Sequence, residues 1–151
     1  MEKKAKVLLL STGDSTRSLM AEGFLKALAG GHFQVVSAGI KPGEPHPLAI
    51  EAMGEVGIDI SGQKSKTVAD SLKEHFTYAV ILYDAAKEHS PIFPFAPKLY
   101  RWSLADPAAA EASNAENKEV FRRTRNEIAR NVEAFLDEAG VKWREAVAIA
   151  A

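Results

Sequence analysis

The stretch KVLLLSTGDSTRSLMAEGFLKAL, from Lys6 to Leu28, decides the fold expected for this chain. It overlaps the continuous apolar run AKVLLLS, which predicts a strand at Ala5–Ser11 that is buried on both faces of a sheet. The glycine-containing segment Ser11–Ser18 comes next. Apolar residues then recur at helical spacing, namely Leu19, Met20, Phe24, Leu25 and Leu28. The stretch therefore predicts a strand, a tight turn and a helix in direct succession.

The rest of the chain alternates between strand-like and helix-like blocks. Further strands are expected at His32–Ile40, Phe76–Asp84 and Lys98–Trp102. Further helices are expected at His46–Gly57, with Pro47 at its start, and from about Asn114 to Ala139. Strands separated by helices imply βαβ units and a parallel sheet. We predict one α/β domain over residues 1–140, with three α/β/α layers and a four-stranded parallel sheet of flavodoxin-like type. Residues 141–151 form a C-terminal tail that the pattern does not place.

The composition sets limits on function. The chain has 151 residues, 46% of them hydrophobic, and a net charge of −1. Near-neutral charge argues against a general nucleic-acid-binding role, and the run Val7–Leu10 is too short for a signal peptide or a membrane span. We therefore expect a cytoplasmic protein with no nucleic-acid partner and no membrane partner. The absence of cysteine excludes disulfides, thiolate metal sites and thiol chemistry, and we expect no metal and no cofactor.

The segment Ser11–Ser18 has the physical features of an oxyanion cradle. A turn that leads into a helix points several backbone N–H groups at one spot, where the helix dipole adds positive potential. Arg17 can direct two hydrogen bonds onto a tetrahedral oxyanion. The predicted cradle consists of Ser11, Thr12, Gly13, Asp14, Ser15, Thr16 and Arg17. The same pattern also fits a plain helix cap supplied by Ser15 or Thr16, so two interpretations stay open at this point.

Several segments carry a resemblance to a known family. They read RSLMAEGFLKAL, VVSAGI, HPLAIEAMGEVGIDISGQKSK, PIFPFAPKLYRWSLADPAAAE and FRRTRNEI. In this order they resemble the thioredoxin-coupled arsenate reductases, which share a fold and a C-x5-R loop with the low-molecular-weight protein tyrosine phosphatases. The resemblance covers roughly residues 5 to 138 and implies the low-molecular-weight phosphotyrosine phosphatase fold.

The resemblance also identifies what this chain lacks. In the family, the nucleophilic cysteine stands at the position of Ser11 and a second cysteine at that of Thr16. The reductases carry two more where this chain has Tyr83 and Ser90. Because that route of arsenate reduction consumes thiol electrons, we expect neither reduction nor coupling to thioredoxin. Ser11 is a poor substitute nucleophile, since an alkoxide forms at a pKa many units above that of a thiol.

Other family positions are retained or altered. The resemblance places Asp106 at the general-acid position, although an aspartate before proline also serves as a plain cap. Ser18 and Ser37 correspond to hydroxyls that support the loop. Asp14 stands where most members have asparagine and adds a negative charge beside the anion. Lys66 either supports the loop by pairing with Asp14, which cancels the charge, or remains solvated and unpaired.

These residues are compatible with two classes of function. In the first, the chain is a cysteine-free, catalytically impaired member that binds phosphate, arsenate or a phosphorylated ligand. In the second, it is a slow phosphatase in which Ser11 or a water attacks and Asp106 acts as general acid. We favour the first. Deliberate removal of cysteines is disfavoured, because a designer would seldom choose tyrosine at position 83.

Overall fold

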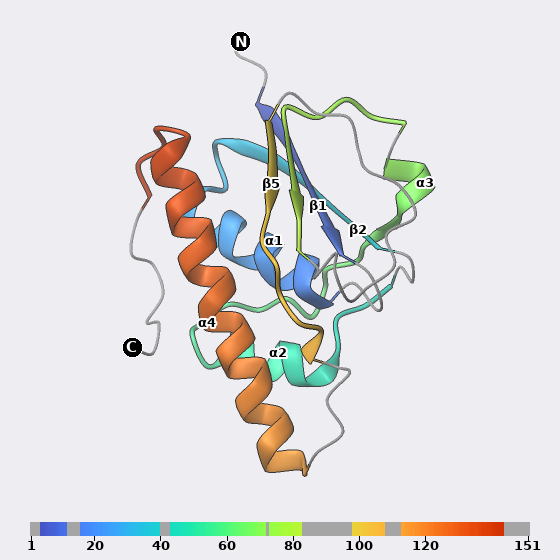
Figure 1. The fold of residues 1–151 in the computed structure, drawn as a ribbon, viewed down its shortest axis with the longest axis vertical. Coiled ribbons are helices and arrows are strands. Elements are labelled where there is room, and N and C mark those ends of the chain that lie inside the picture. Colours follow the sequence, from blue (N-terminus) through green and yellow to red (C-terminus); the bar gives the residue numbers. More distant parts are fainter. Residues whose placement is uncertain are drawn as a thin grey trace.

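A five-stranded parallel sheet forms the centre of the structure, a computed structural model that describes residues 4–11, 16–39, 43–71, 73–82, 98–107 and 113–143 (Figure 1). The strands are β1 (Ala5–Ser11), β2 (Phe33–Gly39), β3 (Lys66–Thr67), β4 (Tyr78–Ile81) and β5 (Lys98–Arg101). Their order across the sheet is β3-β2-β1-β4-β5, and every neighbouring pair is parallel. The predicted parallel α/β fold is therefore confirmed.

The expected number of strands was wrong by one. The four predicted strands are present as β2-β1-β4-β5, and the fifth strand is the two-residue β3, which pairs with the end of β2 through Ala38 and Lys66. Two residues are too few to show any hydrophobic alternation. This strand is defined by its hydrogen-bonded neighbour, and local sequence carries no signal for it.

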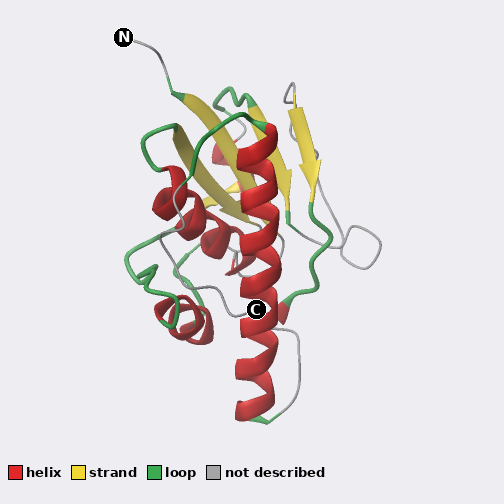
Figure 2. Ribbon diagram, turned by 90° about the vertical axis from the view of Figure 1, so that its left-hand side faces the viewer, coloured by secondary structure: helices red, strands yellow, loops and turns green. Residues whose placement is uncertain are grey.

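Helices cover both faces of the sheet. The helices α1 (Thr16–Ala29), α2 (Pro47–Gly54) and α4 (Asn114–Glu138) share one apolar core with the face of β1 that bears Val7 and Leu9. The short α3 (Val68–Ser71) lies on the other face, where Val68 packs near Leu8 and Leu10. Figures 1 and 2 show α4 lying along the sheet. The result is the predicted three-layer arrangement.

Side chains at the helix starts explain where two of these helices begin. The Nδ1 atom of His46 accepts a hydrogen bond from the backbone N–H of Leu48 at 3.0 Å, and Pro47 occupies the first turn of α2. The hydroxyl of Ser113 accepts from the N–H of Glu116 at 3.2 Å, which caps α4. Both caps satisfy N–H groups that have no partner within the helix.

After α4 the chain folds back on the helix end. The N–H of Val141 donates to the carbonyl of Leu136, and the indole N–H of Trp143 donates to Asp137 at 2.8 Å. The first residues of the predicted tail therefore pack on α4. Residues 144–151 are beyond the part of the chain that the structure describes.

A charged cluster joins α2 to α4. Glu55, at the end of α2, accepts from Nε and Nη2 of Arg122 at 3.0 and 2.8 Å and from Nη1 of Arg125 at 2.7 Å. The side chain of Arg125 is only 3% exposed, and its Nη1 also donates to the carbonyl of Ala52 at 2.8 Å. The hydrogen bond from Arg122, supported by that from Arg125, holds the pKa of Glu55 below its ordinary value of 4.5.

Replacing Glu55 with glutamine is expected to lower the free energy of unfolding near neutral pH by about 1–2 kcal/mol. This is the low end for charged hydrogen bonds, because a third of the side chain reaches solvent. The folded-state pKa is depressed, so the carboxylate stabilises the protein above about pH 4.5, and this stabilisation disappears as the pH falls through the lowered pKa. The difference between the unchanged chain and Glu55→Gln should therefore shrink in acid.

Urea unfolding at a series of pH values measures this difference. Glu127→Gln is the matched control, because Glu127 lies on α4, the helix whose arginines pair with Glu55, but has no ion pair among the described residues. A pH-independent difference for Glu55→Gln would contradict the assignment of its stabilising effect to the ionised carboxylate.

Candidate functional site

The candidate site lies where β1 ends and α1 begins. Ser11 closes β1 and is paired in register with Gly39, while β4 lies on the other side of β1. From β1 the chain continues through α1 to β2, which pairs with one edge of β1, whereas β4 pairs with its other edge. The carboxyl end of β1 is therefore a topological switch point. Ligands bind at such points in open α/β sheets. Of the predicted cradle, Ser11, Thr16 and Arg17 are described, whereas residues 12–15 lie outside the described ranges.

Ser11 is held from behind by a network of buried hydroxyls. Its side chain is 1% exposed, and its Oγ donates to Oγ of Ser18 at 3.0 Å. The hydroxyl of Ser37, on β2, lies 3.2 Å from the carbonyl oxygen of Ser18 and 2.7 Å from Oε1 of Glu22. The structure thus brings together Ser11, Ser18 and Ser37, the last two being the residues whose hydroxyls are expected to support the loop.

Arg17 is a buried arginine that reaches across the sheet. Its side chain is 1% exposed, and Nη1 donates to the carbonyl of Leu104 at 2.9 Å. Its Nη2 lies 4.0 Å from Oδ2 of Asp106, whose side chain is 21% exposed. A guanidinium has five N–H donors, and the contact with Leu104 fixes the plane of the group. The structure therefore places the predicted oxyanion-binding arginine beside the predicted general acid.

Lys66 has a partner that the sequence did not indicate, namely Glu74. Its Nζ lies 3.1 Å from Oε2 of Glu74, and Nζ of Lys6 lies 3.1 Å from the other carboxylate oxygen. Hydrogen bonds from Lys66 first, and from Lys6 second, hold the pKa of Glu74 below its ordinary value. The interpretation of Lys66 as unpaired is wrong. Asp14 is among the residues that are not described, so its partners are not assigned.

Sequence reasoning missed Glu22. This glutamate is 5% exposed and lies on α1, one turn after Ser18. Besides Ser37, it binds Nζ of Lys26 through Oε2 at 2.6 Å. A signal was present in the sequence, since Glu22 interrupts the apolar positions of α1, and a charged residue on a buried helix face is retained when polar partners surround it.

Ser37→Ala is expected to lower the free energy of unfolding by about 1–3 kcal/mol. The substitution removes the hydroxyl that lies 2.7 Å from the buried carboxylate of Glu22, and a buried acceptor that loses a donor carries a penalty of this size. Urea unfolding measures the effect, with Ser103→Ala as the control because Ser103 is exposed. Equal midpoints for the two variants would show that the Ser37 hydroxyl contributes nothing.

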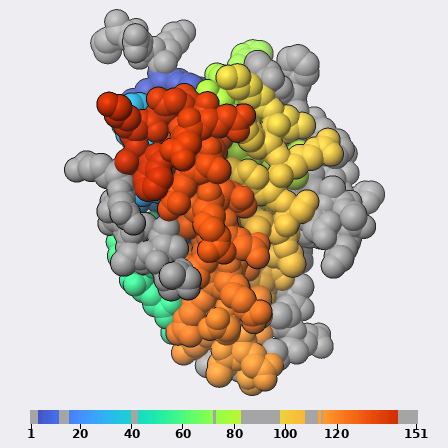
Figure 3. All heavy atoms as spheres, turned by 60° about the vertical axis from the view of Figure 1, so that its left-hand side comes forward, coloured from blue at the N-terminus to red at the C-terminus, as the bar shows by residue number. Residues whose placement is uncertain are grey.

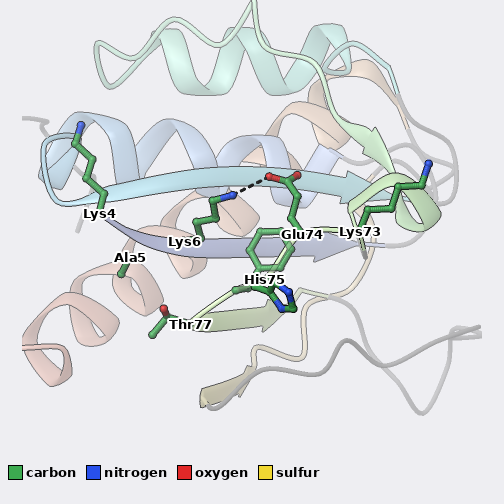
Figure 4. A pocket seen from close by; sticks show the side chains of 8 residues that line it. Lys4, Ala5, Lys6, Lys73, Glu74, His75 and Thr77 are labelled. Atoms are coloured by element: carbon green, nitrogen blue, oxygen red, sulfur yellow. Dashed lines mark hydrogen bonds and ion pairs between the residues drawn. The ribbon is translucent and has the colours of Figure 1, made fainter. Parts of the chain in front are cut away.

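A cavity of about 700 Å³ lies at the opposite end of the sheet. It is lined by residues that precede or begin β1 and β4, including Lys4, Lys6 and His75. In Figure 4 the side chains of Lys6 and Glu74 point toward each other, whereas those of Lys4 and Lys73 point away from the centre of the cavity. Ala5 also lines this cavity, and Ser11 follows it by six residues along β1, a distance of about 20 Å at the rise of a strand. This cavity is therefore separate from the candidate site.

The described ranges contain neither a metal-binding cluster nor a membrane-spanning helix. Within those ranges, no three His, Asp or Glu side chains lie close enough together to hold a metal ion. No helix there has the length and apolar character needed to cross a bilayer.

The fold and the site together define a class of protein. They show a parallel α/β sheet whose first strand ends in a buried hydroxyl, Ser11, and whose next helix starts with a buried arginine, Arg17. Comparison with known proteins then gives the family. Residues 6–145 match the family described as low molecular weight phosphotyrosine protein phosphatase, and the chain belongs to that family.

Similar sequences include bacterial arsenate reductases. The chain is 39% identical over 137 residues to the arsenate reductase of Halalkalibacterium halodurans, a match that covers 91% of this chain and 98% of the relative. It is 37% identical to the arsenate reductase of Bacillus subtilis (strain 168), with the same coverage of both chains. The family resemblance seen in the sequence is therefore confirmed.

Solved structures of arsenate reductases and of a phosphatase have a fold similar to that of this chain. A structure titled "An arsenate reductase in the phosphate binding state" superposes with a TM-score of 0.72 at 32% identity, covering 89% of this chain and 98% of the other. The low molecular weight protein tyrosine phosphatase from T. tengcongensis has a TM-score of 0.66 at 23% identity, which supports the fold alone.

Proposed function

We propose that this chain is a catalytically impaired member of its family that binds phosphate-like oxyanions at the Ser11–Ser18 loop, in the cytoplasm. One observation carries the proposal. The buried Arg17 is retained and oriented beside Asp106, while the residue at the end of β1 is a serine whose hydroxyl bonds only another hydroxyl among the described contacts. Groups suited to binding are present, and a reactive nucleophile is missing.

The orientation of Arg17 favours binding. Its side chain is already out of water and held by the carbonyl of Leu104, so an arriving anion does not have to immobilise it. Groups that are oriented before the ligand arrives lose little conformational entropy on binding. A relative whose title records a phosphate binding state supports inorganic phosphate as the first ligand to test.

The surroundings of Ser11 do not favour catalysis. Activation of a serine requires a base that takes the hydroxyl proton. Ser11 donates to Ser18, and a neutral hydroxyl is a weak base. Of the described histidines, His46 caps α2, and none is hydrogen-bonded to Ser11. His89 lies in a segment that the structure leaves undescribed.

Thiol-based reduction is also outside the chemistry of this chain. It has no cysteine at any position, so it can form no mixed disulfide with thioredoxin. We accordingly propose phosphate, arsenate or a phosphorylated ligand as the partner, and neither thioredoxin nor a cofactor.

Titration calorimetry with phosphate, arsenate and sulfate tests the binding half of the proposal. We expect saturable binding at millimolar concentration or below. If none of the three anions binds in that range, the loop is not an oxyanion site.

A second function remains a candidate because Asp106 lies 4.0 Å from Arg17, within reach of a ligand held there. In this alternative the chain is a slow phosphatase, with attack by Ser11 or by water and Asp106 as the general acid. An assay with para-nitrophenyl phosphate separates the two functions. The proposed function predicts the same background rate for the unchanged chain, Ser11→Ala and Asp106→Ala, whereas the alternative predicts turnover that falls in Asp106→Ala.

A further inference from the structure

A groove runs between α4 and the segment that follows β5. It consists of two adjoining hollows of about 350 and 410 Å³, both lined by Ser103 and Glu127. Figure 3 shows α4 and β5 side by side on this face of the molecule, and the rings of Tyr100 and Phe135 pack 5.2 Å apart between them. The groove is therefore formed by two elements that are firmly packed together.

Three arginines give the groove a positive charge. Arg101 and Arg130 line one hollow and Arg123 lines the other. The acidic residue between them is Glu127, so the groove carries a net charge of about +2 from these four side chains.

The arginines of α4 divide into two kinds. Arg122 and Arg125 face α2 and both pair with Glu55, and Arg122 also pairs with Glu119. Arg123 and Arg130 are exposed, and neither has an ion pair or a side-chain hydrogen bond among the described residues. Ion pairing inside the fold therefore accounts for Arg122 and Arg125, whereas Arg123 and Arg130 are exposed to solvent in the groove.

The groove borders the candidate oxyanion site. Leu104 lines one hollow, and its carbonyl accepts the hydrogen bond from Arg17. Ala105 lines the other hollow and directly precedes Asp106. A molecule lying in the groove would thus reach the segment that carries the predicted general acid.

We infer that this groove docks an acidic segment of a partner protein. Planar guanidinium groups pair with carboxylates through two hydrogen bonds, and charge complementarity of this kind guides association. A nucleic acid fits less well, because its phosphate backbone is normally bound by a strong basic excess and the whole chain has a net charge of −1. The inference depends on the groove alone and does not require the loop to bind an anion.

Fluorescence polarisation of labelled hexaglutamate, at low salt and with the full chain, tests the inference. We expect saturable binding that weakens by roughly 3- to 30-fold in the double variant Arg123→Gln/Arg130→Gln, the range for two partly exposed charge pairs. Glu127→Gln should act in the opposite direction and tighten binding by about 2- to 5-fold. Both changes are at exposed side chains, and thermal melting verifies that the variants are folded.

The matched control is Lys4→Gln/Lys73→Gln, which changes the net charge by the same amount at exposed lysines beside the cavity at the other end of the sheet. This control should bind like the unchanged chain. Three outcomes would overturn the inference: no binding at millimolar peptide, equal losses in the two double variants, or tighter binding of oligothymidylate through the same arginines.

Discussion

Replacing Ser11 with cysteine is expected to raise the rate of para-nitrophenyl phosphate hydrolysis by at least about 100-fold over the unchanged chain. Ser11 ends β1 next to the start of α1, where the helix dipole and Arg17 stabilise a negative charge. A thiol with an ordinary pKa of about 8.5 ionises readily in such a field, whereas the pKa of an alcohol lies far above that of a thiol and the hydroxyl stays protonated. We therefore attribute the expected lack of catalysis to the absence of a thiol at position 11.

Two further variants make this result specific. Ser11→Ala should stay at the background rate. The combination Ser11→Cys/Asp106→Ala should lose most of the gained activity, because the leaving oxygen then lacks its proton donor. If Ser11→Cys remains as slow as Ser11→Ala, the loop no longer positions a nucleophile, and loss of catalysis extends beyond the lost cysteine.

Truncation of Arg17 to alanine is expected to weaken phosphate binding by roughly 10- to 150-fold, because a charged hydrogen-bonded contact contributes about 1.5–3 kcal/mol. Ser11→Ala removes one neutral contact, at about 0.5–1.5 kcal/mol, and should weaken binding by only about 2- to 10-fold. Titration calorimetry with phosphate measures both. Equal losses for the two variants would refute the assignment of Arg17 as the main oxyanion-binding side chain.

Arg17 is also part of the core, so its removal affects folding as well as binding. The truncation leaves the carbonyl of Leu104 without its donor, and urea unfolding should show a loss of stability. Arg17→Lys separates the two effects. Lysine retains a positive charge but cannot form two parallel hydrogen bonds, so we expect a folded protein with affinity between those of the unchanged chain and Arg17→Ala.

The elements predicted best are those whose signal is local. The strand Ala5–Ser11 was predicted to the residue, because a strand buried on both faces has a continuous apolar sequence. The α4 helix was predicted within one residue, because its apolar stripe is long and Ser113 caps its start. The predicted strand Phe76–Asp84 was longer than β4, since apolar character continues beyond the residues that pair with β1.

The parts of the site that escaped prediction depend on tertiary contacts. Ser11 and Arg17 can be recognised from the sequence because they are only six positions apart in the chain. The acceptor that orients Arg17 is a backbone carbonyl, and any residue at position 104 would supply one. The pairing of Lys66 with Glu74 likewise arises because β3 brings Lys66 beside the segment that leads into β4. Neither contact has a sequence pattern of its own.

The hydrogen bond between Arg17 and Leu104 joins residues 87 positions apart. It therefore ties the start of α1 to the segment after β5, the last strand to enter the sheet from the ribosome. A nascent chain that ends before Lys98 contains the whole of Ser11–Ser18 but lacks the carbonyl that orients its arginine. Closing so long a loop is slow compared with forming the helix itself. We therefore expect the proposed oxyanion site to be completed only after the helix that carries Arg17 has formed.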